Sequence, residues 1–173
     1  SAGEHPVTNV KFTQYIELDP TRIPTANKAY KRRFSKRGGQ HDSQSKNQNV
    51  DVRIGLYVTT NERLISYPNL DLDEKKSQNQ KLLIQGIILD QQGCRKGCLT
   101  VDMEGNAVVG HDEGVFFYRP RERGPCYVFD GPKRHVLWCG QYMVVLTNQN
   151  NTGSRLQVYD LRHKFVACTV SLR

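Results

Sequence analysis

The 173-residue chain has no long hydrophobic run. Its longest candidate, residues 82–89, is interrupted by Gln85 and Gly86, so it falls short of the ~20 apolar residues that a membrane-spanning helix needs. The N-terminal residues also lack the basic start and apolar stretch of a secretory signal peptide. The sequence therefore excludes a membrane-spanning protein, and we expect a cytoplasmic one.

Apolar residues are scarce overall. They make up 37% of the chain, below the roughly 45–50% of typical globular domains. The length fits one domain of roughly 100–200 residues, so a core is expected, but part of the chain is expected not to pack. Because the first residue is Ser1 rather than Met, we also expect a segment of a longer protein.

Cysteine is present in an odd number, five, so the thiols cannot all be paired within the chain. Cys126, Cys139 and Cys168 each lie in or beside an apolar stretch, where a free cysteine behaves as a small buried hydrophobe. We therefore expect these three thiols to be buried and the protein to occupy a reducing compartment.

The sequence has no complete set of metal ligands. Cys94 and Cys98 have the spacing of half a zinc site, but no second close pair of Cys or His accompanies them. His135 and Cys139 are four residues apart, which in a strand separates their Cα atoms by about 13 Å. We predict no metal site and no cofactor.

A catalytic constellation is also lacking. Cys126 with His111 or His135 would be a thiol nucleophile with its base, but a buried thiol and surface imidazoles explain the same residues. There is no Gly-rich loop with the lysine that phosphate binding requires. We predict that the protein is not an enzyme and that it has no catalytic residues.

What the sequence does have is an excess of positive charge in one segment. Seven basic residues and one acid, Asp42, lie between residues 28 and 46 and account for six of the eight net positive charges. The rest is nearly neutral, which argues against nucleic-acid binding by the whole domain. One helical turn would place the rings of Tyr30 and Phe34 on one side. The candidate contacts with anionic lipid or a partner are Lys28, Tyr30, Lys31, Arg32, Arg33, Phe34, Lys36 and Arg37.

The same segment contains a candidate modification site. Arg32, Arg33 and Phe34 precede Ser35 in the pattern of a basophilic kinase substrate, and a phosphate there would weaken docking on an anionic surface. Residues 13–50 are otherwise rich in polar residues, so they bury too little surface to offset their ordering entropy. The alternative to a docking segment is therefore a solvated, disordered insertion with chance motifs.

Short apolar runs bounded by Gly, Asn, Asp and Pro predict roughly twelve strands and no helix. Three of the runs end in Tyr67, Tyr118 and Tyr159, at intervals of 51 and 41 residues. Removing the ten-residue polar run 71–80 makes both intervals 41. A period of about 40–45 residues with four strands per unit is typical of a β-propeller blade.

The predicted fold is therefore all-β, a partial, open β-propeller of about three four-stranded antiparallel blades with a long disordered basic insertion. Blade one spans residues 7–89, with the insertion at 13–50 and a loop at 71–80, blade two spans 98–130, and blade three spans 135–171. Three blades do not close a ring, because propellers have about 4–8. An ordinary antiparallel sandwich is the alternative.

Two local motifs support the blades. The pair Tyr159-Asp160 resembles the aromatic-Asp pair of WD repeats, whose acid accepts hydrogen bonds from the following turn. The segment from His111 to Gly114 is typical of a hairpin turn between two strands.

Several segments resemble one family. They are RERGPCYVF at residues 121–129, GHDEGVFFY at 110–118, YDLRHKFVA at 159–167 and VTTNE at 58–62. These are similar to the N-terminal propeller of the vacuolar protein sorting-associated protein 11 family, the class C core subunit of the HOPS and CORVET tethers. The resemblance covers most of the chain from about Val52 onward and the opening strand, but neither residues 13–50 nor the loop 71–80.

The resemblance implies a scaffold for vesicle tethering in endosome-to-lysosome or vacuole transport and membrane fusion. It implies partners among the other class C subunits and a peripheral location on late endosomes, lysosomes or vacuoles. The alternative is a propeller-type binding module that uses the basic insertion for anionic lipid or nucleic acid.

Overall fold

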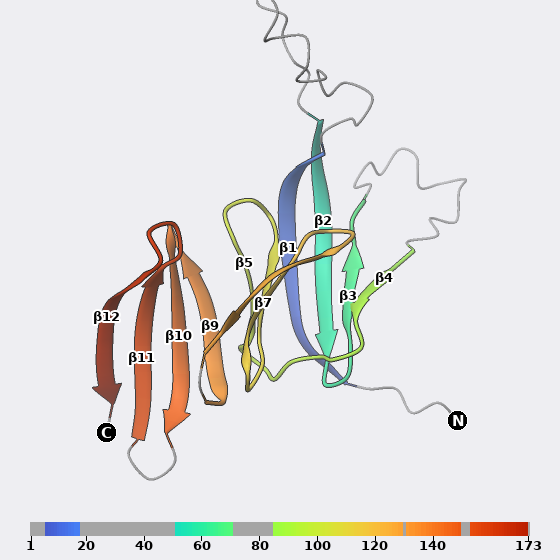
Figure 1. Ribbon diagram of the computed structural model, residues 1–173. Helices are drawn as coiled ribbons and strands as arrows, with labels where there is room; N and C mark the ends of the chain where they lie inside the picture. Colours follow the sequence, from blue (N-terminus) through green and yellow to red (C-terminus); the bar gives the residue numbers. More distant parts are fainter. Residues whose placement is uncertain (1–5, 18–50, 71–84, 130, 150–152, 173) are drawn as a thin grey trace, which may run out of the picture. The chain divides into compact units, whose positions relative to one another are not determined.

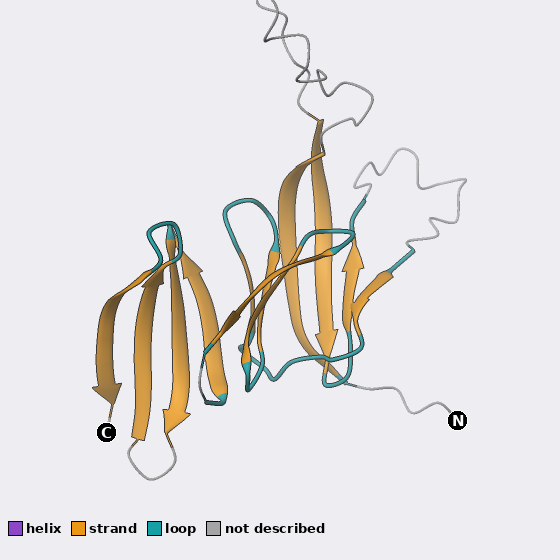
Figure 2. Cartoon of the chain, viewed as in Figure 1, coloured by secondary structure: helices purple, strands orange, loops and turns teal. Residues whose placement is uncertain are grey.

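The computed structural model describes residues 6–17, 51–70, 85–129, 131–149 and 153–172 (Figure 1). In these residues all regular structure is β, in twelve strands, and no helix is present (Figure 2). The strands form three four-stranded sheets, each in sequence order, with antiparallel pairing. This is the architecture of a partial, open β-propeller, with each sheet as one blade.

The first sheet contains β1 (Val7–Glu17), β2 (Asp51–Thr60), β3 (Leu64–Tyr67) and β4 (Ile87–Asp90). The strand β1 was predicted to end at residue 12 but continues into the segment assigned to the insertion. Thr13 and Tyr15 are buried there, where Thr13 Oγ1 donates a hydrogen bond of 2.7 Å to Gly105 O and the Tyr15 hydroxyl donates to Pro68 O. The rest of the predicted insertion and the loop 71–80 lie outside the described residues.

The second sheet contains β5 (Leu99–Val101), β6 (Ala107–Gly110), β7 (Gly114–Tyr118) and β8 (Arg123–Val128). Every residue of β6 and β7 is buried. The hairpin predicted between them is confirmed, because the His111 N–H donates a 2.8 Å hydrogen bond to Gly114 O. Burial on both faces shows that this sheet is the middle one of three packed layers.

The third sheet contains β9 (Lys133–Cys139), β10 (Tyr142–Gln149), β11 (Gly153–Asp160) and β12 (Phe165–Leu172). The three repeat tyrosines, Tyr67, Tyr118 and Tyr159, lie at the end of the third strand of their sheets, as the period predicted. The regular spacing along the chain therefore corresponds to equivalent positions in space.

Two apolar clusters join the sheets. The first lies between sheets one and two and is built around Tyr57, Leu64, Leu99 and Tyr118. The second lies between sheets two and three and is built around Phe117, Val136, Met143 and Val145. Because each strand alternates its side chains between two faces, the end sheets use only one face for these clusters.

The other face of each end sheet is apolar and open. On the third sheet, a row of paired residues crosses four strands. That row consists of Leu137, Val144, Val158 and Cys168. On the first sheet, Phe12 of β1 is 69% exposed and Ile88 of β4 is 47% exposed. Both outer faces therefore have the composition of surfaces that pack against a further sheet.

The structure corrects the predicted burial of three thiols. Cys139 and Cys168 are exposed on the third sheet and Cys126 is exposed on the edge strand β8, whereas the buried thiols are Cys94 and Cys98 at the first junction. On β9, Val136 is buried, but Leu137 on the opposite face is 54% exposed. The physical reason is the same in both cases, since an apolar strand sequence determines burial only where a second layer covers it.

Candidate interaction surfaces

Hydrogen bonds from two tyrosine hydroxyl groups connect sheets one and two at their junction. The Tyr57 hydroxyl donates to Gly105 O at 3.2 Å, and the Tyr118 hydroxyl donates to Asp90 Oδ2 at 2.5 Å. Burial raises the pKa of both phenols well above their ordinary value, so both stay protonated donors. Burial also raises the pKa of Asp90, but the hydrogen bond from Tyr118 outweighs it together with smaller contributions, so the net shift is downward.

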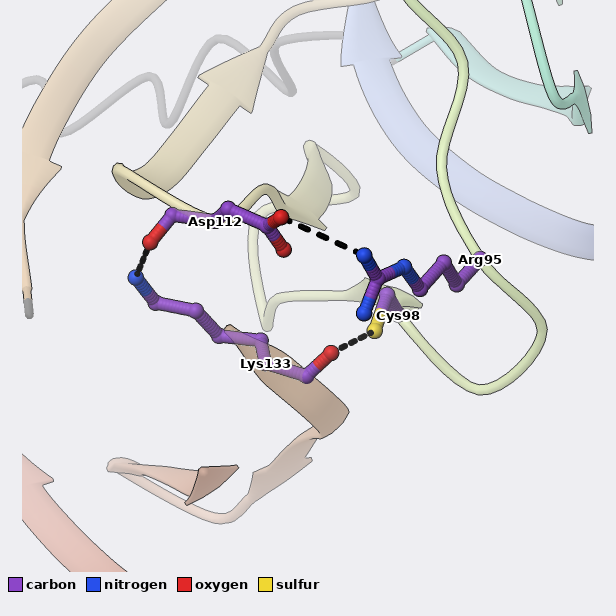
Figure 3. A network of polar contacts seen from close by, with 4 residues as sticks. All are labelled: Arg95, Cys98, Asp112 and Lys133. Atoms are coloured by element: carbon purple, nitrogen blue, oxygen red, sulfur yellow. Dashed lines mark hydrogen bonds and ion pairs between the residues drawn. The ribbon is translucent and has the colours of Figure 1, made fainter. Parts of the chain in front are cut away.

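A polar network joins the loop before β5, the turn between β6 and β7 and the start of β9 (Figure 3). Lys133 is only 1% exposed, and its Nζ donates to Asp112 O at 2.8 Å and to Phe129 O. Arg95 Nη2 contacts Asp112 Oδ2 at 3.2 Å, and Cys98 Sγ donates to Lys133 O at 3.3 Å. The contacts of Lys133 with Asp112 and Cys98 join the second sheet to the third, and the Arg95–Asp112 ion pair joins two loops of the second sheet.

The buried thiol in this network, Cys98, is a poor nucleophile. Burial raises the pKa of Cys98 to about 11, so the nucleophilic thiolate is a very small fraction at neutral pH. Cys126, the thiol considered as a nucleophile, is exposed on β8, and no hydrogen bond joins it to His111 or His135 in the described part of the chain. Across the same residues, no group of three His, Cys, Asp or Glu side chains is placed to hold a metal ion.

His111 is buried, contrary to the expectation of a surface imidazole. Its ring packs edge-on against Phe116 at 5.1 Å between centroids, and its Nε2 has no hydrogen-bond partner among the described residues. Burial lowers its pKa below the ordinary value, despite the opposing charges of Glu113 and Asp90. The neutral imidazole therefore serves as part of the packed junction.

The junction between sheets two and three is open on one side as a groove. Its larger hollow has a volume of about 1090 Å³ and its smaller one about 380 Å³. Tyr127 of β8 and Leu161 after β11 line both hollows. Aromatic rings line both hollows, namely Phe117, Trp138 and Tyr142 in the larger one and Phe129, Tyr159 and Phe165 in the smaller one.

The turn from β11 to β12 lies beside both hollows and is held by Asp160. This buried carboxylate accepts a 3.0 Å hydrogen bond from the His163 N–H and lies 2.9 Å from His163 Nδ1. The side-chain hydrogen bond from His163 lowers the pKa of Asp160 below its ordinary value. The predicted role of the Tyr159-Asp160 pair in fixing the following turn is therefore confirmed.

The residues predicted to contact anionic lipid or a partner lie outside the described residues, as does the candidate phosphorylation site, Ser35. They are Lys28, Tyr30, Lys31, Arg32, Arg33, Phe34, Lys36 and Arg37. Sequence reasoning missed the groove, because its walls come from strands that pair only in the folded chain. In the sequence, Tyr127 and Trp138 are only single aromatic residues of β8 and β9, and in β7 only Phe117 of the three aromatic residues lines the groove.

Residues 3–173 match the family model described as PEP5/VPS11 N-terminal. The chain belongs to this family. Among curated PEP5/VPS11 relatives, the vacuolar protein-sorting-associated protein 11 homolog of Arabidopsis thaliana is 32% identical over 83 residues, which is 47% of this chain and 9% of the relative. The mouse homolog is 30% identical over 130 residues, and the human homolog is 28% identical over 130 residues. Each of these alignments covers 65% of this chain and 13% of the relative.

The PEP5/VPS11 resemblance and the groove coincide in the structure. Residues 121–129 span β8 and the residues on either side of it, and residues 159–167 span the end of β11, the turn and the start of β12. These are two of the segments whose sequence resembles the family, and both line the groove. In the described part of the chain, no helix has the length and apolarity needed to cross a bilayer.

Proposed function

We propose that this chain is a non-enzymatic scaffold segment of a vesicle-tethering complex in endosome-to-lysosome or vacuole transport and membrane fusion. The match of residues 3–173 to the PEP5/VPS11 N-terminal family carries the proposal, and relatives named for vacuolar protein sorting support it. The structure supports it through stacked sheets whose apolar outer faces suit contact with protein rather than chemistry. The partners are other class C subunits, and the location is peripheral, on late endosomes, lysosomes or vacuoles.

Affinity capture followed by mass spectrometry tests this function. The tagged 173-residue chain is incubated with cell lysate, and we expect other class C vacuolar protein sorting subunits among the retained proteins. A matched variant carries Gln at the six basic candidate residues Lys28, Lys31, Arg32, Arg33, Lys36 and Arg37. The variant should retain the same subunits, because a scaffold uses its folded sheets.

Recovery of RNA instead of class C subunits would contradict the scaffold, provided that circular dichroism shows the chain to be folded. RNA retention through the basic segment would fall steeply with salt, because counterions are released on binding, and it would be lost in the glutamine variant. This outcome identifies the alternative binding module.

We also propose that the basic segment docks on anionic membrane surfaces. Its support is compositional, since Tyr30 and Phe34 lie among six basic residues. Each Lys or Arg near an anionic leaflet contributes about 1 kcal/mol, and the two rings add apolar burial at the interface. For a tethering scaffold, this contact would hold the domain at the membrane.

Vesicle flotation tests the docking. The chain should float with phosphatidylserine vesicles and less so in high salt or after Ser35→Asp. A matched Ser43→Asp change outside the aromatic cluster should weaken flotation less. Equal flotation with neutral vesicles, or none with anionic ones, would overturn the docking proposal.

A further inference from the structure

The groove between sheets two and three has features of a peptide site that the scaffold function does not require. Its two hollows are neighbours, because Tyr127 and Leu161 line both of them. Aromatic walls of this kind accept apolar side chains. An extended peptide points alternate side chains in the same direction at a spacing of ~6.6 Å, so residues two apart would enter such a feature together.

The aromatic rings that line the groove pack against one another. Phe117 lies edge-on to both Tyr127 and Trp138, with centroids 5.6 Å and 6.1 Å apart. Phe129 contacts the Tyr159 ring at 4.4 Å between centroids. These rings extend from the second apolar cluster, so the walls are preformed before any ligand binds.

The charged residues that line the two hollows indicate what kind of peptide would bind there. Arg162 lines the larger hollow and Lys164 lines the smaller one, and both are exposed. The turn that carries them is fixed by Asp160, whose own charge is engaged by His163. The two cations are therefore held beside the apolar walls and available to an acidic partner.

The other charged residues of the groove determine which way an acidic peptide would lie in it. Asp102 and Glu104 line only the larger hollow, on the turn between β5 and β6. Arg119 also lines it, but its Nη1 is paired with Glu122 Oε1 at 2.6 Å. The positive end of the groove is thus the turn between β11 and β12, and an acidic peptide would place its carboxylates there.

We infer that the groove binds a short extended segment of another protein, with apolar side chains two residues apart and flanking Asp or Glu residues. The apolar side chains enter the hollows beside Tyr127, and the carboxylates pair with Arg162 and Lys164. This inference does not depend on the tethering function, since it rests on the groove alone.

Trp138 provides a direct reporter. It is the single Trp of the chain and lines the larger hollow, so ligand binding there changes its emission. The protein used is the full chain with Gln at the six basic positions of the insertion, which removes electrostatic binding elsewhere. The probe is a pool of hexapeptides with Phe, Leu, Ile or Val at the second and fourth positions and Asp or Glu at the others.

Two reference pools separate the sources of binding. One replaces the acids by Lys and Arg, and the other keeps the acids but has Ser and Gly at the second and fourth positions. We expect a saturable change in Trp138 emission with the acidic apolar pool and at least tenfold weaker binding of each reference pool. Equal binding of the acidic apolar pool and either reference pool, or no saturable change, would overturn the inference.

Substitutions then locate the site. Arg162→Glu combined with Lys164→Glu should weaken binding of the acidic apolar pool at least tenfold. Arg134→Glu, an exposed residue of β9 outside both hollows, should change binding less than twofold. Equal losses in the two variants, with folding verified by circular dichroism, would show that binding is not in the groove. If Trp138 emission changes with protein concentration in the absence of peptide, a second copy of the chain occupies the groove. This result would also overturn the peptide-binding inference.

Discussion

At the residue scale, Gly105 shows how one position controls a junction between sheets. It has φ of +86°, and an added Cβ would lie 2.3 Å from Gln14 O and 2.8 Å from Thr13 Oγ1. Its own carbonyl accepts hydrogen bonds from Thr13 and Tyr57. Backbone conformation and lack of space both require glycine here.

The first prediction compares two glycines with the same backbone conformation. Gly105→Ala should destabilise the chain by about 3 kcal/mol or more, because conformational strain of about 1–2 kcal/mol is added to overlap with β1. Gly131→Ala is the control, since φ is +83° but the nearest atom is Asn148 O at 3.8 Å. Denaturant unfolding measures both. Equal losses in the two variants would show that only backbone conformation matters.

The second prediction concerns His111 and pH. Burial lowers its pKa in the folded chain, so the unfolded chain binds a proton more readily. Stability is therefore full above the unfolded pKa of about 6.5 and falls as pH decreases below it, by at most about 1.4 kcal/mol per pH unit. The groups nearby are Asp90, Asp112, Glu113 and Arg123.

Unfolding measured between pH 7.5 and 5.5 checks this prediction. His111→Gln should remove this part of the pH dependence, because glutamine does not titrate. His135→Gln removes an exposed imidazole from β9 and is the matched control, which should retain the pH dependence due to His111. A parallel loss of stability on acidification in the parent chain and the His111 variant would contradict the assignment.

At the element scale, the outer edge strands differ in how they resist pairing with other chains. β4 has four residues and ends in Asp90, and β8 contains Pro125 and Arg123. β12 has eight exposed residues, with the sequence FVACTVSL, and no charge, proline or glycine. Charged residues and proline are the features that protect sheet edges, so β12 is the unprotected edge of the described sheets.

The third prediction follows from this edge. Thr169→Lys, on β12, should slow aggregation of the chain at least severalfold, because a charge on an edge strand opposes addition of another strand. Gln141→Lys adds the same charge at the exposed turn between β9 and β10 and should have a smaller effect. Light scattering and thioflavin fluorescence over time compare them. Equal protection by both variants would attribute the effect to net charge.

At the scale of the whole molecule, the burial pattern follows from a stack of three sheets with two open ends. The central strands β6 and β7 of the middle sheet are buried on both faces, whereas among the described residues each end sheet has an exposed apolar face. Exposed apolar surface of this extent favours association. The chain by itself is therefore expected to self-associate through its outer faces.

The fourth prediction tests the outer face of the third sheet. Leu137→Glu combined with Val158→Glu should shift the chain toward monomer in sedimentation velocity, because both residues belong to the row across that face. Val145→Glu is the contrasting change, since Val145 is fully buried in the second cluster and its substitution should unfold the chain. Unchanged association in the double variant would place the contact elsewhere.

The sequence alone determined the strands, the repeat and the hairpin turns, because these depend on local alternation, on turn residues and on a regular spacing. Tyr67, Tyr118 and Tyr159 revealed equivalent third strands, and Asp160 revealed the turn that it holds. Family membership was also recognisable from short segments, and the family match over residues 3–173 confirmed it.

Only the tertiary structure decided which faces are covered. The apolar neighbours of Cys126, Cys139 and Cys168 predicted burial, but their positions relative to the other sheets left them exposed, while His111 became buried. The groove likewise depends on the packing of the second sheet against the third. Burial and binding surfaces depend on contacts between strands far apart in sequence, and local alternation carries no information about which layer lies opposite.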